Sequence, residues 1–160
     1  MKDHISSTGL SVLFERTARL IHSIGFAEGL YPAQWVALRF FSEAPPSSRT
    51  SADLARFQGI SLGPVARTVR TLVEKGLLAR VANPASRRAD LIAVTSAGHD
   101  YLKHDPRAAI TAIVEGMQNE QRLALALALE ALVPTLYAQQ LIVKSTSPPH
   151  HDSSSGEIQP

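Results

Sequence analysis

The side chains in this sequence best suited to binding chemistry are four arginines, namely Arg67, Arg70, Arg87 and Arg88. A guanidinium group can donate two hydrogen bonds to the edge of guanine, or it can pair with a phosphate. The segment from Arg49 to Asp90 holds eight basic and three acidic residues, so its formal charge is +5. The whole chain carries only +2, which leaves −3 for the remainder. This distribution favours a polyanion as partner, with the alternative that the arginines merely solvate the exposed faces of small helices.

The first two arginines fall in a segment with the pattern of an amphipathic helix. Ser61 is suited to its N-cap, because a serine oxygen can accept a hydrogen bond from a free amide of the first turn. Gly76 suits the left-handed position that follows a helix. Apolar residues recur on one face of the predicted helix, at Val65, Val69, Leu72 and Val73. The arginines therefore share the opposite face with Gly63 and Pro64.

A shorter helix is predicted just upstream, from Ser51 to Gln58. Thr50 or Ser51 together with Asp53 gives a capping signature at its start, and Gly59 suits the positive φ of a sharp turn at its end. Two helices joined by so short a turn are typical of a helix-turn-helix, although an ordinary helical hairpin is the alternative.

Two short apolar runs, Leu77–Val81 and Asp90–Val94, follow and predict a β-hairpin. The loop between them carries Arg87 and Arg88. A hairpin with a basic loop directly after such a helix has the form of the wing of a winged helix. With the helix in the major groove of DNA, this loop would reach the minor groove or a phosphate strand.

Each of these residues therefore has an expected place on double-stranded DNA. Arg67 is expected on a base edge, and Arg70 on a phosphate. Arg88 is expected in the minor groove, with Arg87 on a phosphate. The residues at the start of the helix are expected closest to the groove floor or the backbone, and they are Ser61, Gly63 and Pro64.

The same residues resemble a known family. The run "LYPAQWVALRFF", then "LARFQGISLGPVARTVRTLVEKGLLAR", then "RRADLIAVTSAG", is similar in order and spacing to the MarR family of winged helix-turn-helix transcriptional regulators. The resemblance is good from Leu30 to Gly98 and looser in the flanking helices. It implies a bacterial or archaeal homodimer that binds a pseudo-palindromic operator and is often released by a small molecule.

Two positions depart from the pattern of this family. Where members usually have an acidic residue before the wing arginines, this chain has Ser86, so the ion pair that commonly braces Arg88 cannot form. Where members usually begin their second helix with Ser or Thr, this chain has Tyr31 before Pro32, which removes the capping oxygen. A tyrosine there would instead face a cavity or a partner subunit.

Composition narrows the classes of protein to consider. A chain of 160 residues with 44% apolar residues can bury one ordinary core. The absence of cysteine excludes disulfides, thiolate metal sites and thiol-based sensing. The N-terminus lacks an apolar segment of signal-peptide length, and no apolar run approaches a membrane span. We expect a cytoplasmic protein that is not an enzyme and needs no cofactor or metal.

The expected fold class is mainly α with a small β-hairpin wing, an α+β winged helix-turn-helix flanked by helices that form a dimer. Further helices are predicted from Leu10 to Ile24, from Pro32 to about Phe41, and after Thr95, with a break at Asp105-Pro106. The expected divisions are an N-terminal dimerisation helix, the DNA-binding domain, C-terminal dimerisation helices and a disordered tail, at residues 1–29, 30–98, 99–143 and 144–160.

The run "LALALAL", Leu123–Leu129, has the period of a strand. Alanine and leucine are strong helix formers and alanine is poor in strands, so we expect a helix capped by Asn119. Because this helix is apolar nearly all round, its expected place is a subunit interface, packed against the first helix and the one preceding it. Pro134 is expected to kink or end it.

The aromatic residues of the first two helices are candidates for a ligand site. Such a site would suit an aromatic or carboxylate compound, with Arg16, Arg19 or His22 nearby as the cation. The bland alternative is that these side chains are plain core aromatics. The candidates are Phe14, His22, Tyr31, Trp35 and Phe41.

Other chemistry has little support. Asp100 and His104 have a helical spacing that can hold a metal, but a single pair is more typical of a surface ion pair. Ser96 lies near His99 and Asp100 without a nucleophile elbow. The expected function is a transcriptional repressor, and the alternative is a winged helix used only for protein contacts, without DNA binding.

Overall fold

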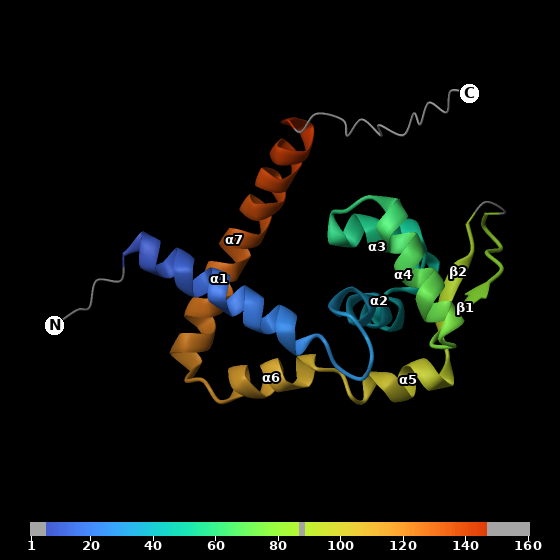
Figure 1. Ribbon diagram of the computed structural model, residues 1–160, viewed down its shortest axis with the longest axis horizontal. Coiled ribbons are helices and arrows are strands. Elements are labelled where there is room, and N and C mark those ends of the chain that lie inside the picture. Colours follow the sequence, from blue (N-terminus) through green and yellow to red (C-terminus); the bar gives the residue numbers. More distant parts are fainter. Residues whose placement is uncertain (1–5, 87–88, 147–160) are drawn as a thin grey trace, which may run out of the picture. The chain divides into compact units, whose positions relative to one another are not determined.

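A computed structural model describes residues 6–86 and 89–146 of the chain (Figure 1). In order, the elements are α1 Ser7–Ile24, α2 Pro32–Glu43, the short 3-10 helix η1 Pro46–Ser48, α3 Ser51–Gln58, α4 Leu62–Glu74, β1 Leu78–Val81, β2 Leu91–Val94, α5 Ser96–Leu102, α6 Arg107–Glu115 and α7 Asn119–Thr146. The fold is mainly helical with one antiparallel hairpin, which confirms the expected fold class. No described helix is long and apolar enough to cross a membrane.

The chain divides into two units after Gly116. The first holds α1 to α6 with the hairpin, and the second holds α7. The core lies in the first unit, where α2 supplies its largest buried side chains, Trp35, Leu38 and Phe41. Because α3, α4 and the hairpin each bury their apolar side chains against this core, α2 sets the positions of α3 and α4.

Local signals set the boundaries of α3. The Thr50 hydroxyl accepts a hydrogen bond from the Asp53 amide at 3.1 Å, and so caps the start of the helix. At the end of the helix, Gly59 has φ 63°, a left-handed conformation that glycine adopts without steric cost. Both features match the sequence predictions for this helix.

The position of Ser61 as N-cap of α4 is confirmed, because its backbone is extended. The expected cap bond is wrong, since the Ser61 side chain accepts no amide of the first turn. The helix ends at Glu74 with Lys75 as its C-cap, and Gly76 has φ 72°, the left-handed conformation that the sequence predicts. The buried face of the helix consists of Val65, Val69 and Leu72.

The hairpin pairs Leu78 with Val94 and Val81 with Leu91. Leu78 and Ile92 are its buried side chains, and their burial holds the hairpin against the helices. The Ile92 amide also donates to the Arg49 carbonyl at 2.7 Å, which ties the segment before α3 to β2. The hairpin runs alongside α4 (Figure 1).

Helix α2 begins after Tyr31, whose side chain makes no cap bond, but a side chain of the first turn stabilises this end of the helix. The Gln34 side-chain oxygen accepts the Tyr31 amide at 2.9 Å, and Gln34 is buried. This bond is the half of a capping box that the third helical residue supplies. Tyr31 itself supplies no side-chain cap bond, as the sequence predicts, while Gln34 satisfies the amide of Tyr31.

The break at Asp105-Pro106 is confirmed, because α5 ends at Leu102 and α6 begins at Arg107. An Asp105 carboxylate oxygen accepts the Arg107 amide at 2.8 Å, so this side chain satisfies a free amide at the start of α6.

The run Leu123–Leu129 is helical, as predicted, and lies within α7. Pro134 stands inside α7 and does not end it. Asn119 is the first helical residue rather than the cap. At this end of the helix, the Gln121 side chain accepts the amide of Gln118 at 3.1 Å. The helix reaches Thr146, so the expected tail overlaps its last turn. Residues 147–160 lie outside the described part of the chain.

Candidate nucleic-acid interface

One face of α4 is exposed and basic. Gly63, Arg67 and Arg70 lie at positions i, i+4 and i+7, which fall on one side of a helix. All three are exposed, while Val65 and Val69 on the other side are buried. Because one face is held in the core, the arginine face must point to solvent.

The two arginines of this face are available for a ligand. Among the residues that the structure describes, neither Arg67 nor Arg70 forms an ion pair with a carboxylate. An exposed guanidinium without a carboxylate partner can pair with a phosphate without first breaking an internal salt bridge. Glu74 lies one further turn along, at the C-terminal end of the helix. Arg67 therefore lies in the N-terminal half, which is the part that contacts base edges in helix-turn-helix proteins, and Arg70 lies just past the middle of the helix.

The start of α4 is open. Ser61, Gly63 and Pro64 are all exposed. A methyl group added at Gly63 would meet no other atom within 4 Å. These residues therefore leave room for the backbone of the helix to approach a groove closely.

The wing is braced at its base. Arg80 of β1 and Asp90 before β2 are 3.5 Å apart across the hairpin. At the turn, the Asn83 side chain accepts the Ala85 amide at 3.0 Å. The predicted roles of Arg87 and Arg88, and the effect of Ser86 on them, concern residues outside the described chain.

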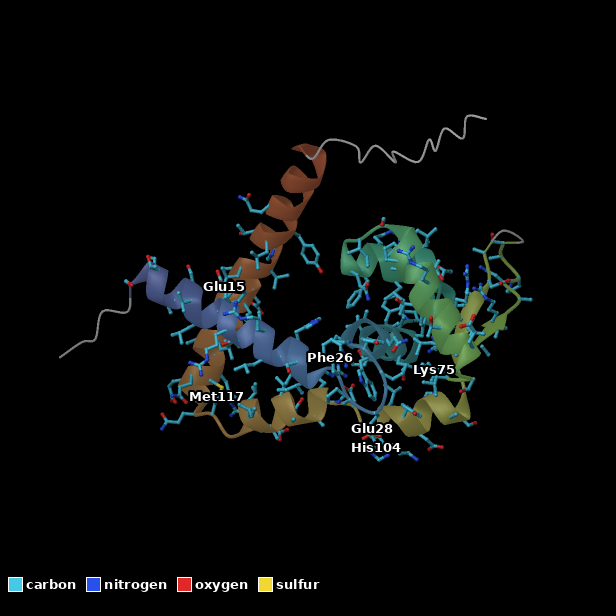
Figure 2. The ribbon with its side chains drawn as sticks, in the orientation of Figure 1. Glu15, Phe26, Glu28, Lys75, His104 and Met117 are labelled. Carbon is cyan, nitrogen blue, oxygen red and sulfur yellow. The ribbon has the colours of Figure 1, made fainter. Side chains whose placement is uncertain are left out.

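The C-terminal end of α4 is tied to two neighbours. Lys75 donates from Nζ to the Gly29 carbonyl at 3.0 Å, and it lies near the loop that carries Glu28 (Figure 2). The Thr95 hydroxyl donates to the Gly76 carbonyl at 2.7 Å and accepts the Gly98 amide at 3.0 Å. These bonds fix the end of α4 against the loop before α2 and the start of α5.

The five aromatic and histidine candidates for a ligand site do not come together within one chain. Trp35 and Phe41 are core residues with exposed fractions of 1% and 0%. Phe14, His22 and Tyr31 are exposed. The rings of His22 and Tyr31 each contact Phe26 edge to face, with centroids 5.2 and 5.6 Å away. The single aromatic site that the sequence suggested is therefore split into two groups, and ligand binding by these residues stays a prediction.

Trp35 has one unusual feature for a core residue. Its buried Nε1 has no hydrogen-bond acceptor among the described residues. Its ring lies 6.4 Å from that of Tyr101. A buried N–H without an acceptor is costly, so Trp35 differs from the other core aromatics.

The predicted Asp100–His104 pair is not the one that the structure forms. Lys103 donates to Asp100 at 2.6 Å, and this hydrogen bond, with the lysine charge, lowers the pKa of Asp100. Among the described residues, no group of three or more histidine or acidic side chains could hold a metal ion.

Sequence reasoning missed an ionic cluster between α2 and the start of α6. Arg39 donates to Asp105 at 2.8 Å, and Arg107 donates to Glu43 at 2.7 Å. Of these four residues, Arg39, Glu43 and Arg107 line a cavity of about 700 Å³ beside α2, η1 and α3. The partners lie 66 and 64 positions apart in the chain, so no local signal could have indicated them.

A buried central helix, two reading helices and a hairpin wing together define a winged helix-turn-helix protein. The MarR family model matches residues 28–89, which span α2 to the wing. This part of the chain is therefore similar to the MarR family of winged helix-turn-helix transcriptional regulators.

Solved structures show the same fold. CouR from Rhodococcus jostii RHA1, bound to p-coumaroyl-CoA, has a TM-score of 0.66 and 22% identity, over 82% of this chain and 95% of CouR. A mutant MarR from E. coli, complexed with operator DNA, has a TM-score of 0.62 and 19% identity, over 78% of this chain and 91% of the MarR chain. RV1404 from Mycobacterium tuberculosis has a TM-score of 0.60 and 27% identity, over 84% of this chain and 97% of the RV1404 chain. No curated protein matched the chain in sequence.

Proposed function

We propose that this chain acts in the cytoplasm as a homodimeric transcriptional repressor on a pseudo-palindromic operator. The observation that carries the proposal is the exposed face of α4, where Arg67 and Arg70 form no ion pair with a described carboxylate. A similar structure, the E. coli MarR mutant, was solved with operator DNA. The opposite face of α4 is part of the core, so the basic face is presented in a fixed direction.

In the proposed complex, the N-terminal half of α4 enters the major groove. Arg67 donates two hydrogen bonds to guanine, and Arg70 pairs with a phosphate. Ser61, Gly63 and Pro64 lie nearest the groove floor or the backbone. Arg88 of the wing enters the minor groove, with Arg87 on a phosphate.

Two copies of the chain would bind one operator. A homodimer would place its two α4 helices in successive major grooves, roughly 34–36 Å apart. Apolar side chains exposed along α1 and α7 support such an interface. Binding over a promoter would exclude polymerase, and a small aromatic or carboxylate ligand would release the DNA. CouR, bound to p-coumaroyl-CoA, supports the ligand part of this proposal.

Selection of bound sequences from a random DNA pool, followed by gel shifts, tests this function. Arg67→Ala should weaken binding and relax the preference at one base pair, because a two-bond contact to guanine discriminates by about 1–3 kcal/mol. Arg88→Ala should weaken binding to all sequences alike. Arg122→Ala on α7 is the control and should bind as the parent does. If Arg67→Ala and Arg88→Ala both bind like the parent, the assigned roles are wrong.

The salt dependence separates DNA binding from a winged helix used only for protein contacts. Each neutralised phosphate should lower the logarithm of the affinity by about 0.9 per tenfold increase in salt. A chain that shows no salt-sensitive binding to any DNA would be a protein-contact module.

A further inference from the structure

We propose that Leu62, the first residue of α4, contacts the C5-methyl group of a thymine in the major groove of the operator. This inference deepens the proposed function and rests on it, because Leu62 can meet a base only where α4 enters the groove. It assigns one base of the half-site to an apolar contact, close to the guanine assigned to Arg67.

Leu62 is the large apolar side chain that α4 leaves in solvent. Its exposed fraction is 51%, whereas those of Val65, Val69 and Leu72 on the same helix are at most 2%. Among the described residues, Leu62 is not part of the apolar core or of the side chains packed against it. A single exposed leucine is common on protein surfaces, so the place of Leu62 on the helix, rather than its exposure alone, supports the inference.

Leu62 stands at the end of α4 that would face the groove. In a helix-turn-helix, residues near the start of the second helix contact base edges. Side chains of a helix lean towards its N-terminus, so that of the first residue extends past the helix end. Ser61, Gly63 and Pro64 around it are exposed, and a methyl group added at Gly63 would meet nothing within 4 Å. The residues next to Leu62 therefore leave its approach to a base open.

Leu62 begins a row of side chains that runs beside the row of Arg67. Leu62, Ala66 and Arg70 are spaced by four residues, so they follow one another along the helix surface. Gly63 and Arg67 form the neighbouring row with the same spacing. The first row therefore has an apolar start, a small side chain in its middle and a cation at its far end, which suits a base edge followed by a phosphate.

The chemistry of a leucine side chain selects one base. It has no hydrogen-bond donor or acceptor, so it cannot read the polar edges of the bases. Thymine alone presents a methyl group in the major groove, and its contact with leucine removes both groups from water. Leu62 precedes Arg67 by five residues, which is about 7.5 Å along the helix. Since base pairs are stacked about 3.4 Å apart, the thymine should lie about two base pairs from the guanine.

Replacement of thymine by uracil in the selected operator tests the contact, because the two bases differ only in this methyl group. Each thymine of one half-site is replaced in turn, and the affinity of the full chain is measured by fluorescence anisotropy. Uracil at one position should weaken binding by about fourfold, the factor that corresponds to burial of one methyl group. A half-site without thymine, or one in which uracil has no effect at any position, would overturn the proposal.

Variants of Leu62 assign the methyl group to this side chain. Leu62→Ala should bind the thymine and uracil operators equally, and about as weakly as the parent binds the uracil operator. Leu62→Met keeps a long apolar side chain and should retain most of the preference for thymine. Each variant is judged by the ratio of its two affinities, so a general loss of affinity does not affect the result. If Leu62→Ala remains as sensitive to uracil as the parent, Leu62 does not make the contact.

Two further variants are controls. Arg67→Ala should weaken binding but keep the uracil effect at the same position, because the two side chains contact different base pairs. Val81→Ala truncates another exposed apolar side chain, 46% exposed on the hairpin, and should keep the preference for thymine in full. Circular dichroism establishes that each variant is folded. If the chain selects no DNA, the proposed function fails and this inference with it, whereas selection of DNA without a uracil effect overturns only the inference.

Discussion

At the scale of single residues, Gly98 shows how closely the hairpin and the helices approach each other. A methyl group at this position would collide with the Leu77 carbonyl oxygen and would lie 2.7 Å from the Val94 side chain. Neither neighbour can move freely, because Leu77 is buried and its carbonyl accepts the Thr95 amide at 3.1 Å. Gly98→Ala should therefore lower the free energy of unfolding by about 1–3 kcal/mol, measured by urea denaturation.

Gly63→Ala is the matched control for this substitution. A methyl group there meets nothing within 4 Å, and alanine is the better helix former. Its stability should stay the same or rise by up to about 1 kcal/mol. If both variants lose stability alike, the steric explanation for Gly98 is wrong.

At the scale of secondary structure, the start of α3 links capping to pH. The Thr50 hydroxyl donates to the Asp53 carboxylate at 2.6 Å and accepts its amide at 3.1 Å. The first bond is the main reason why the pKa of Asp53 is lowered; burial opposes the shift, and Arg56 adds to it. Since the pKa is lower in the folded state, this stabilisation is complete above the unfolded-state value of about 3.9. It is lost as the pH falls through the folded-state pKa.

Thr50→Ala should cost about 1 kcal/mol of unfolding free energy at pH 7, because α3 loses its cap. The difference from the parent should narrow at pH 3 and below, where the carboxylate contribution disappears from the parent as well. Urea denaturation at the two pH values measures both effects. Ser61→Ala is the control and should cost less, since the Ser61 side chain makes no cap bond. A difference that does not change with pH would exclude the proposed role of the Asp53 carboxylate.

At the scale of the whole molecule, the exposed apolar side chains of α1 and of α7 are the main feature that a single chain leaves unexplained. Leu123, Leu127 and Leu136 of α7 are each about half exposed, at 59%, 59% and 49%. Helix α1 buries none of its residues and exposes several large apolar side chains. Exposed apolar surface of this extent marks an interaction site, which is why we place a homodimer interface there.

Leu127→Glu should convert the proposed dimer into a monomer, because the interface would have to bury an unpaired charge. Analytical ultracentrifugation measures the oligomeric state of the parent and of each variant. Gln121→Glu adds the same charge to the same helix at a polar position and should leave the dimer intact. A monomeric parent chain, or a dimeric Leu127→Glu variant, would rule out this interface.

The sequence alone determined α3, α4 and the turn between them, because capping residues and glycines close by in the chain set where these helices begin and end. Thr50 caps α3, and Gly59 and Gly76 adopt left-handed conformations that other residues take up only with strain. The helical state of Leu123–Leu129 also follows from intrinsic preference, which outweighed the alternating pattern.

Tertiary structure alone decided the features that depend on contacts between distant segments. The sequence left open whether Trp35 and Phe41 belong to a ligand site or to the core, and packing put both in the core of the first unit. It gave no sign that Arg107 would meet Glu43, or that Arg39 would meet Asp105, beside a cavity. A cap or a turn depends on neighbours along the chain, so residue types reveal it. A cavity and its charges depend on which helices pack together, and that is set by the burial of the whole apolar core.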